Sequence, residues 1–471
     1  MVQKNFKLGI NVKNSNSKNL KLFQYLCVGV FLVKLLLIAR ISPLAQWTYQ
    51  GNIWLGADGE NYLIGVNALS RDGVLSNQEI LNYWPAGYPI FIYMFGIFGK
   101  TQALTFLSVF QSFVFSYSVY LISKEIFNIG HRKAAKLICF FLLFNPTLTL
   151  SSMAVGYESL VASGYLLIIT LSLQVIKNSN GKRNWFKLIL IAASFSFVCS
   201  LQPRLIISAF IFALILSIHK INLRKSILEL LIFLILVSSF PALLVARNHF
   251  ASGLNVLSLN LGTTMNIGAG EGATGGYMTT YKGVPCKETP ESEIVSKEGL
   301  PSKYDRARAL NDNAKIKCVL SWYVKNINKL PGLFWNKTIY FWSPWVGPLT
   351  NGTMARNPWF QNNPIRDIAK TPSGYNLVYG MVGKIISWVW LIFGLMLMLI
   401  GFLKIIRLGE SSKYLGILLI SIIVPSWLVS LVTLGDNRFR LPILGATVIL
   451  QVFGLLTLFR DKSLYARNIK N

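Results

Sequence analysis

Acidic residues are scarce in this chain, and charged residues of both signs are few. Of 471 residues, 18 are Asp or Glu and 46 are Lys or Arg; charged residues make up 14% of the sequence and hydrophobic ones 53%. This composition, with a mean hydropathy of +0.49, argues against a soluble protein. The formal charge of +28 does not indicate nucleic-acid binding, because the basic residues are scattered between apolar runs and form no separate basic domain.

Residues typical of metal and nucleotide sites are also few. Three scattered histidines form no zinc motif, and the glycines have neither P-loop nor dinucleotide-binding spacing. We therefore expect no cofactor. Carboxylates could recruit a divalent cation through oxygen ligands, but nothing in the sequence requires one.

The five cysteines fall into two groups. Cys27, Cys139 and Cys199 lie inside apolar runs, where a cysteine is most simply a small packed side chain. Cys286 and Cys318 share one long polar segment and could form a disulfide if that segment faces an oxidising compartment. The sequence leaves that pairing open.

Apolar runs of about 20 residues recur along the chain, each long enough to cross a bilayer as a helix. Since no alternating pattern suggests a β-barrel, the sequence predicts an all-α polytopic membrane protein with about ten spans. The predicted spans are 23–41, 102–122, 134–153, 159–176, 185–201, 205–218, 227–246, 383–403, 414–434 and 441–459.

Polar stretches between the spans divide the chain into three parts. An N-terminal bundle, 1–246, includes a first outer loop at 42–89, which is followed by a short interfacial segment at 90–98. A large extracytoplasmic loop, 247–376, separates this bundle from the C-terminal helices of 377–471. No internal repeat is visible, which weakens the case for a transporter built from duplicated halves.

Charge asymmetry predicts the orientation. With ten spans, both chain ends and four of the connections fall on one side of the membrane, and together they carry 23 basic residues and three acids. The short connections on the other side carry five basic residues and six acids. By the positive-inside rule both termini are cytoplasmic. We expect a multi-pass protein of the bacterial plasma membrane, with its remaining acids at the outer face.

The sequence Gly56-Ala57-Asp58-Gly59-Glu60-Asn61-Tyr62 places two carboxylates in the first outer loop. The glycines permit a tight turn and close backbone approach. Asp58 and Glu60 are either solvated loop acids or, if desolvated near the headgroups, carboxylates of raised pKa able to act as a base on a hydroxyl. The residues alone leave both interpretations open.

Glu158 is a third outer acid, at the start of a predicted span. An acid at a helix N-terminus is favoured by the macrodipole, which is sufficient to explain it. Alternatively, Glu158 is a second acid of an active site.

Four arginines fall on the same predicted face: Arg204, Arg247, Arg438 and Arg440. Interfacial anchoring would explain some of them. A guanidinium can also hold a phosphate in bidentate fashion and stabilise its charge as a bond breaks.

Several short motifs, in order along most of the chain, resemble those of GT-C glycosyltransferases, of the dolichyl-phosphate-mannose-protein mannosyltransferase and lipid A aminoarabinose transferase types. The motifs are Asp58-x-x-x-Tyr62, Ala68-Leu69, Gly73, Gly87-Tyr88-Pro89, Phe98-Gly99, Asn145-Pro146, Glu158, Arg247-Asn248, Asn260-x-Gly262, Gly268 and Arg438-Phe439-Arg440-Leu441-Pro442. The chain departs from the family near the last motif, where Asp436 must replace an acid or histidine close to the arginine.

The resemblance implies catalytic roles for Asp58, Glu60 and Glu158, with Asp58 as the catalytic carboxylate. It implies substrate binding by Tyr62, Tyr88, Arg204, Arg247, Arg438 and Arg440. The implied reaction moves a sugar from a polyprenyl-phosphate donor to a hydroxyl of a lipid, glycan or protein acceptor at the extracytoplasmic face, with inversion at the anomeric carbon.

Two other classes remain as alternatives. A transporter or flippase of lipid-linked saccharides would also present aromatic and basic residues near the membrane. A non-enzymatic scaffold of the cell envelope predicts that Asp58, Glu158 and Arg438 do not converge around one cavity. Few ionisable residues lie mid-span, whereas an ion-coupled transporter usually needs them.

Overall fold

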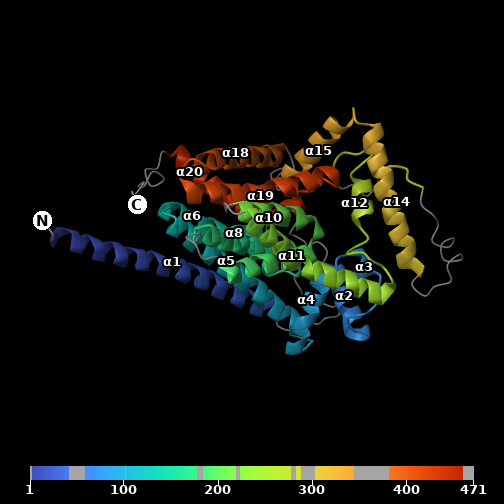
Figure 1. Cartoon of the computed structure of the whole chain (residues 1–471), viewed down its shortest axis with the longest axis horizontal. Helices are drawn as coiled ribbons and strands as arrows, with labels where there is room; N and C mark the ends of the chain where they lie inside the picture. The colour runs from blue at the N-terminus through green and yellow to red at the C-terminus, as the bar shows by residue number, and fades with distance from the viewer. Residues whose placement is uncertain are drawn as a thin grey trace.

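The computed structural model describes residues 3–41, 59–100, 102–177, 184–218, 223–276, 283–287, 303–343 and 381–459. The elements in these ranges are all helices, and the prediction of an all-α polytopic membrane protein is confirmed. Most of the helices lie side by side in one bundle along the long axis of the molecule (Figure 1).

Seven helices of the described part are long and apolar enough to cross a membrane. They are α1 (Gln3–Ile41), α5 (Ala103–Asn128), α8 (Glu158–Lys177), α11 (Leu223–Ser252), α18 (Met381–Ile405), α19 (Glu410–Val432) and the pair η5 (Asn437–Ile443) and α20 (Leu444–Leu458). Two further predicted spans are shorter helices, α9 (Trp185–Leu201) and α10 (Ile206–Ile218), the latter preceded by η2 (Pro203–Leu205).

The tenth predicted span, 134–153, is not one continuous helix. The structure has α6 (Arg132–Leu143) and a separate short helix α7 (Pro146–Ser151) in its place. Pro146 has no N–H to continue α6, and Asn145 instead caps α7 by accepting a hydrogen bond from the Leu148 amide at 3.0 Å. Hydropathy alone detects the apolar run but not this break.

The spans differ in how deeply they are enclosed. α8 and α20 are the most buried of them, whereas α1 and α18 expose most of their apolar side chains. The backbones of α18 and α20 are in direct contact where glycines face the other helix. A Cβ added to Gly401 would collide with the Leu450 carbonyl, and one added to Gly454 would collide with the Leu397 carbonyl. Such close contact of small residues is what holds helices together where burial in lipid gives no driving force.

A second group of helices gathers at the end of the bundle opposite the start of α1 (Figure 1). The first outer loop and the interfacial segment after it contribute α2 (Gly59–Asp72), α3 (Ile80–Tyr83), α4 (Gly87–Met94) and η1 (Phe95–Phe98). The predicted large loop contributes α12 (Leu261–Ile267), α14 (Lys303–Lys325) and α15 (Leu330–Trp342). Cys286 and Cys318 form a disulfide that ties the segment 283–287 to α14.

Candidate active site

The connection leading into α8 is fixed by hydrogen bonds from three other helices. The Gly156 amide donates to the Tyr88 hydroxyl at 2.7 Å, and that hydroxyl donates to Gln111 at 2.8 Å. Gln111 donates in turn to the Ala154 carbonyl at 2.7 Å. Lys34, predicted inside the first span and 1% exposed, donates to Ser152 Oγ at 2.8 Å. The backbone that carries Tyr157 and Glu158 therefore has a fixed position at this end of the bundle.

Glu158 begins α8 and is almost fully buried, with a side chain that is 4% exposed. Its Oε1 accepts a hydrogen bond from Arg438 Nε at 3.2 Å. Arg438 lies in η5, where the Asp436 carboxylate caps the turn by accepting from the Arg438 amide at 2.9 Å. The first residue of α8 and the second residue of η5 thus meet in an ion pair.

Arg204 joins this pair from the turn between α9 and α10. Its guanidinium lies 3.6 Å from the centre of the Phe439 ring. With the Gln202 amide oxygen facing the arginine, Gln202 accepts from Arg204 Nε at 2.6 Å and from the Tyr157 hydroxyl at 3.0 Å. Phe439 directly follows Arg438 in η5. Guanidinium groups from two separate turns therefore lie near each other at this end of the bundle.

Three tyrosines extend the cluster toward α2. The ring centroid of Tyr62 lies 5.0 Å from that of Tyr88 and 6.0 Å from that of Tyr157, in edge-to-face geometry. All three are less than 10% exposed. The structure therefore brings the predicted residues Tyr62 and Tyr88 next to the Glu158 segment. The Tyr88 hydroxyl is engaged on both sides in positioning that segment, a role the sequence did not indicate.

The two acids of the first outer loop are described only in part. Asp58 lies outside the described residues. Glu60 lies in the first turn of α2 by its backbone, and its side chain is likewise outside the description. Gly59, which opens α2 between them, is buried, and Tyr62 follows in the same turn. Of this motif the structure thus places the helix start and the tyrosine.

Arg247 has a different set of partners from the other predicted arginines. It lies near the end of α11 and is 5% exposed. Its guanidinium donates to the carbonyls of Val74 (3.0 Å) and Ser76 and to the side-chain oxygen of Asn82 (3.2 Å). These contacts attach the first outer loop to α11 and account for the burial of the arginine.

Arg440 also contacts backbone carbonyl groups. It is 8% exposed and donates to the carbonyls of Trp342 (2.7 Å) and Ser343 (3.2 Å), where α15 ends. A cation at a helix C-terminus satisfies carbonyls that have no partner within the helix. Of the four predicted arginines, Arg438 pairs with Glu158 and Arg204 lies against the adjacent Phe439, whereas Arg247 and Arg440 bind carbonyl groups.

No family model and no curated protein matches the sequence. The structure is similar to archaeal oligosaccharyltransferase. Two of the similar solved structures are of the enzyme from Archaeoglobus fulgidus. One is AglB in complex with an inhibitory peptide and a dolichol-phosphate, and the other is the oligosaccharyltransferase tethered to an acceptor peptide that contains the NVT sequon. Both are 12% identical, with TM-scores of 0.40 and 0.42 over 95% and 94% of this chain. The chain spans about half the length of these structures, 52% and 50%.

Three residues of the cluster had no role in the sequence prediction. Tyr157 precedes Glu158, Gln202 lies two residues before Arg204, and Phe439 belongs to the Arg438–Pro442 motif, and these positions were the only available signal. The contact of Arg204 with Phe439 depends on the meeting of two turns that lie far apart in sequence. Among the residues that the structure describes, no three His, Cys, Asp or Glu side chains gather as a metal site would require.

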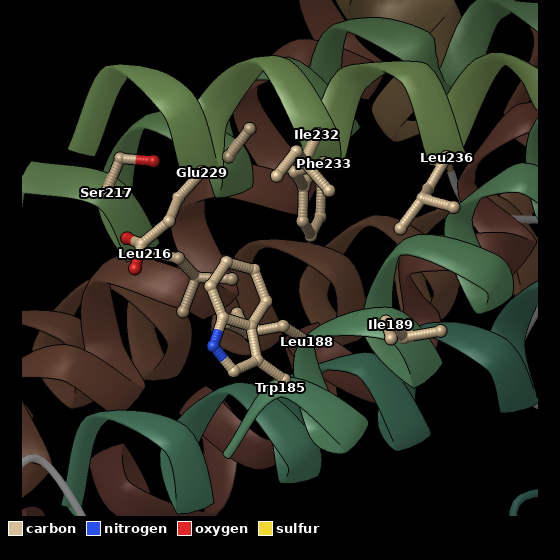
Figure 2. Close-up of a pocket in the computed structure, with 10 residues that line it drawn as sticks. Trp185, Leu188, Ile189, Leu216, Ser217, Glu229, Ile232, Phe233 and Leu236 are labelled. Atoms are coloured by element: carbon tan, nitrogen blue, oxygen red, sulfur yellow. The ribbon is translucent and has the colours of Figure 1, made fainter. Parts of the chain in front are cut away.

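A pocket lies at the opposite end of α9 from this cluster. Apolar side chains of α9, α10 and α11 line it, and the Glu229 carboxylate points toward the indole of Trp185 (Figure 2). Trp185 begins α9 and Gln202 follows its last residue, so about 25 Å of helix separates the two sites. The pocket and the arginine cluster are therefore distinct.

Proposed function

We propose that this chain is an integral-membrane glycosyltransferase of the GT-C type, acting at the extracytoplasmic face of a bacterial plasma membrane with both termini in the cytoplasm. The observation that carries the proposal is the ion pair of Arg438 with the buried carboxylate of Glu158, with the Arg204 guanidinium against the ring of the adjacent Phe439. A paired arrangement of planar guanidinium groups suits a phosphate oxyanion better than lysines would.

The proposed donor is a polyprenyl-phosphate-linked sugar whose lipid enters from the membrane. Arg204 and Arg438 hold its phosphate, while Glu158 and Phe439 keep the two guanidinium groups in place. Arg247 and Arg440 are assigned to the scaffold instead, because backbone carbonyls occupy them.

The proposed base is Asp58, which directly precedes α2. Its carboxylate removes the proton from an acceptor hydroxyl, the hydroxyl oxygen bonds to the anomeric carbon, and the bond from that carbon to the phosphate oxygen breaks. Its electron pair leaves with the polyprenyl phosphate, whose growing negative charge the two arginines stabilise. A base of this kind contributes roughly two to four orders of magnitude in rate.

Sugar transfer by the purified protein in detergent tests the proposal. Asp58→Asn is expected to abolish formation of the glycosylated product from a polyprenyl-phosphate sugar. Asp72→Asn is the matched control, since Asp72 ends the same helix, α2, and forms an exposed ion pair with Arg71. Turnover of Asp58→Asn at the wild-type rate would remove Asp58 from the mechanism. Translocation of labelled donor in vesicles without any covalent product would instead establish a flippase.

A further inference from the structure

The last carbonyls of α19 are capped by two side chains from the outer helices. Lys337 of α15 donates from Nζ to the carbonyls of Leu431 and Thr433, both at 2.8 Å. Tyr323 of α14 donates to the Val432 carbonyl between them at 2.9 Å and accepts from Lys337 Nζ at 3.0 Å. An ammonium group has three N–H donors, and these three acceptors use all of them.

The arrangement is reciprocal. α15 supplies Lys337 to the end of α19, and the chain that follows α19 supplies Arg440 to the end of α15. Each cation therefore lies at the C-terminus of the other segment's helix, where the macrodipole favours positive charge. These two caps, with Tyr323, form what we call the carbonyl clamp.

The clamp brackets the segment that carries Arg438. Residues 434–439 lie between the two caps. Their backbone has little freedom next to the Lys337 cap, at Gly435. The Gly435 amide donates to the Gly275 carbonyl at 2.9 Å. A Cβ on Gly435 would collide with the backbone of Lys337 and with that same carbonyl. Arg438 follows three residues later.

Helix capping alone does not explain a lysine at this position. Lys337 is fully buried, and burying a charged amine costs free energy that a neutral capping group would avoid. Lys337 instead joins the carbonyls of Leu431 and Thr433 to the Tyr323 hydroxyl that caps Val432, immediately before the turn that Asp436 caps.

We propose that Lys337 is a positioning residue of the active site, which through the carbonyl clamp holds Arg438 in the orientation that binds the donor phosphate. This inference rests on the proposed function. It assigns to the outer helices α14 and α15 a role in ordering the phosphate site, although neither contributes a residue to the Arg438–Glu158 pair.

The test combines hydrogen exchange with ligand binding by the full-length protein in detergent. In Lys337→Met, the amides of residues 433–440 are expected to exchange about tenfold faster, because the caps that order them are lost. Affinity for farnesyl phosphate is expected to fall about tenfold, with no change for farnesol, which lacks the phosphate. Lys329→Met is the matched control, because Lys329 precedes α15 and forms an exposed pair with Glu271.

A double-mutant cycle separates positioning from general destabilisation. The effect of Lys337→Met on farnesyl phosphate binding should disappear in an Arg438→Ala background, since both changes then remove the same contact. If Lys337→Met does not fold, Tyr323→Phe removes the cap on Val432 and one acceptor of Lys337 while leaving the two Lys337–carbonyl bonds, with an expected loss of about threefold in the same assay.

The outcomes distinguish the inference from the function on which it rests. Wild-type exchange and affinity in Lys337→Met, or full additivity with Arg438→Ala, would overturn the role of Lys337 alone. If wild-type protein binds farnesyl phosphate no better than farnesol, the phosphate site itself is refuted, and the positioning role with it.

Discussion

Arg438 Nε lies 3.2 Å from Glu158 Oε1, although 280 positions separate the two residues in the sequence. The carboxylate is almost completely buried and the arginine is 17% exposed on its side chain. Removing one partner of such a pair leaves an uncompensated charge, which is far more harmful than the net contribution of the intact pair. The pair therefore fixes the orientation of the arginine more than it adds stability.

Glu158→Gln is expected to lower kcat/KM for sugar transfer by about a hundredfold, because Arg438 loses the charge that orients it. Initial rates at varied donor concentration measure the change. Glu125→Gln is the control, since Glu125 is an equally buried glutamate at the last turn of α5. Equal losses in the two variants would contradict a specific role for Glu158.

Arg204→Lys keeps the positive charge but removes the planar group that stacks on Phe439 and binds Gln202. We expect about tenfold weaker donor binding, since a stacked guanidinium and its bidentate contacts are not reproduced by an ammonium group. The KM for the donor should therefore rise, while the KM for the acceptor, measured in the same assay, should stay unchanged. An increase confined to acceptor KM would assign Arg204 to the other substrate.

Arg247→Met is expected to destabilise the protein by about 2–4 kcal/mol, because the Val74 and Ser76 carbonyls and Asn82 lose a buried donor. Thermal unfolding in detergent measures the loss. Donor KM of the remaining folded protein should stay near that of the wild type. A large rise in donor KM at unchanged stability would return Arg247 to the substrate-binding residues that the sequence predicted.

Burial lowers the pKa of Lys337 to about 7, and the titratable group facing it in the described structure is the hydroxyl of Tyr323. An unfolded lysine keeps its proton up to about pH 10.4. Between these values the unfolded chain binds more protons than the folded one, so stability rises with pH. The melting temperature of the wild type should therefore rise relative to that of Lys337→Met as pH increases from 7 to 9. Parallel curves for the two proteins would contradict this expectation.

The fold class could be predicted because hydropathy is a local property of the sequence. Runs of apolar residues mark α8 and α19 within a few residues of their observed bounds, since a helix that crosses lipid satisfies its own backbone. The same averaging missed the break between α6 and α7, where a single proline and its capping asparagine decide the backbone. Asp58 stays a prediction from sequence, because it lies outside the described residues.

Sequence alone determined that this is a helical membrane protein and that acids and arginines are concentrated in the connections between its apolar helices. Which of those side chains meet was decided by tertiary structure. All four predicted arginines lie near predicted membrane boundaries, and the sequence did not separate them by role. Only the packing of α8, η2 and η5 brings Arg438 to Glu158 and Arg204 to Phe439, while Arg247 and Arg440 satisfy carbonyl groups of neighbouring segments. An ion pair between residues so far apart in the chain depends on distances that no local pattern encodes.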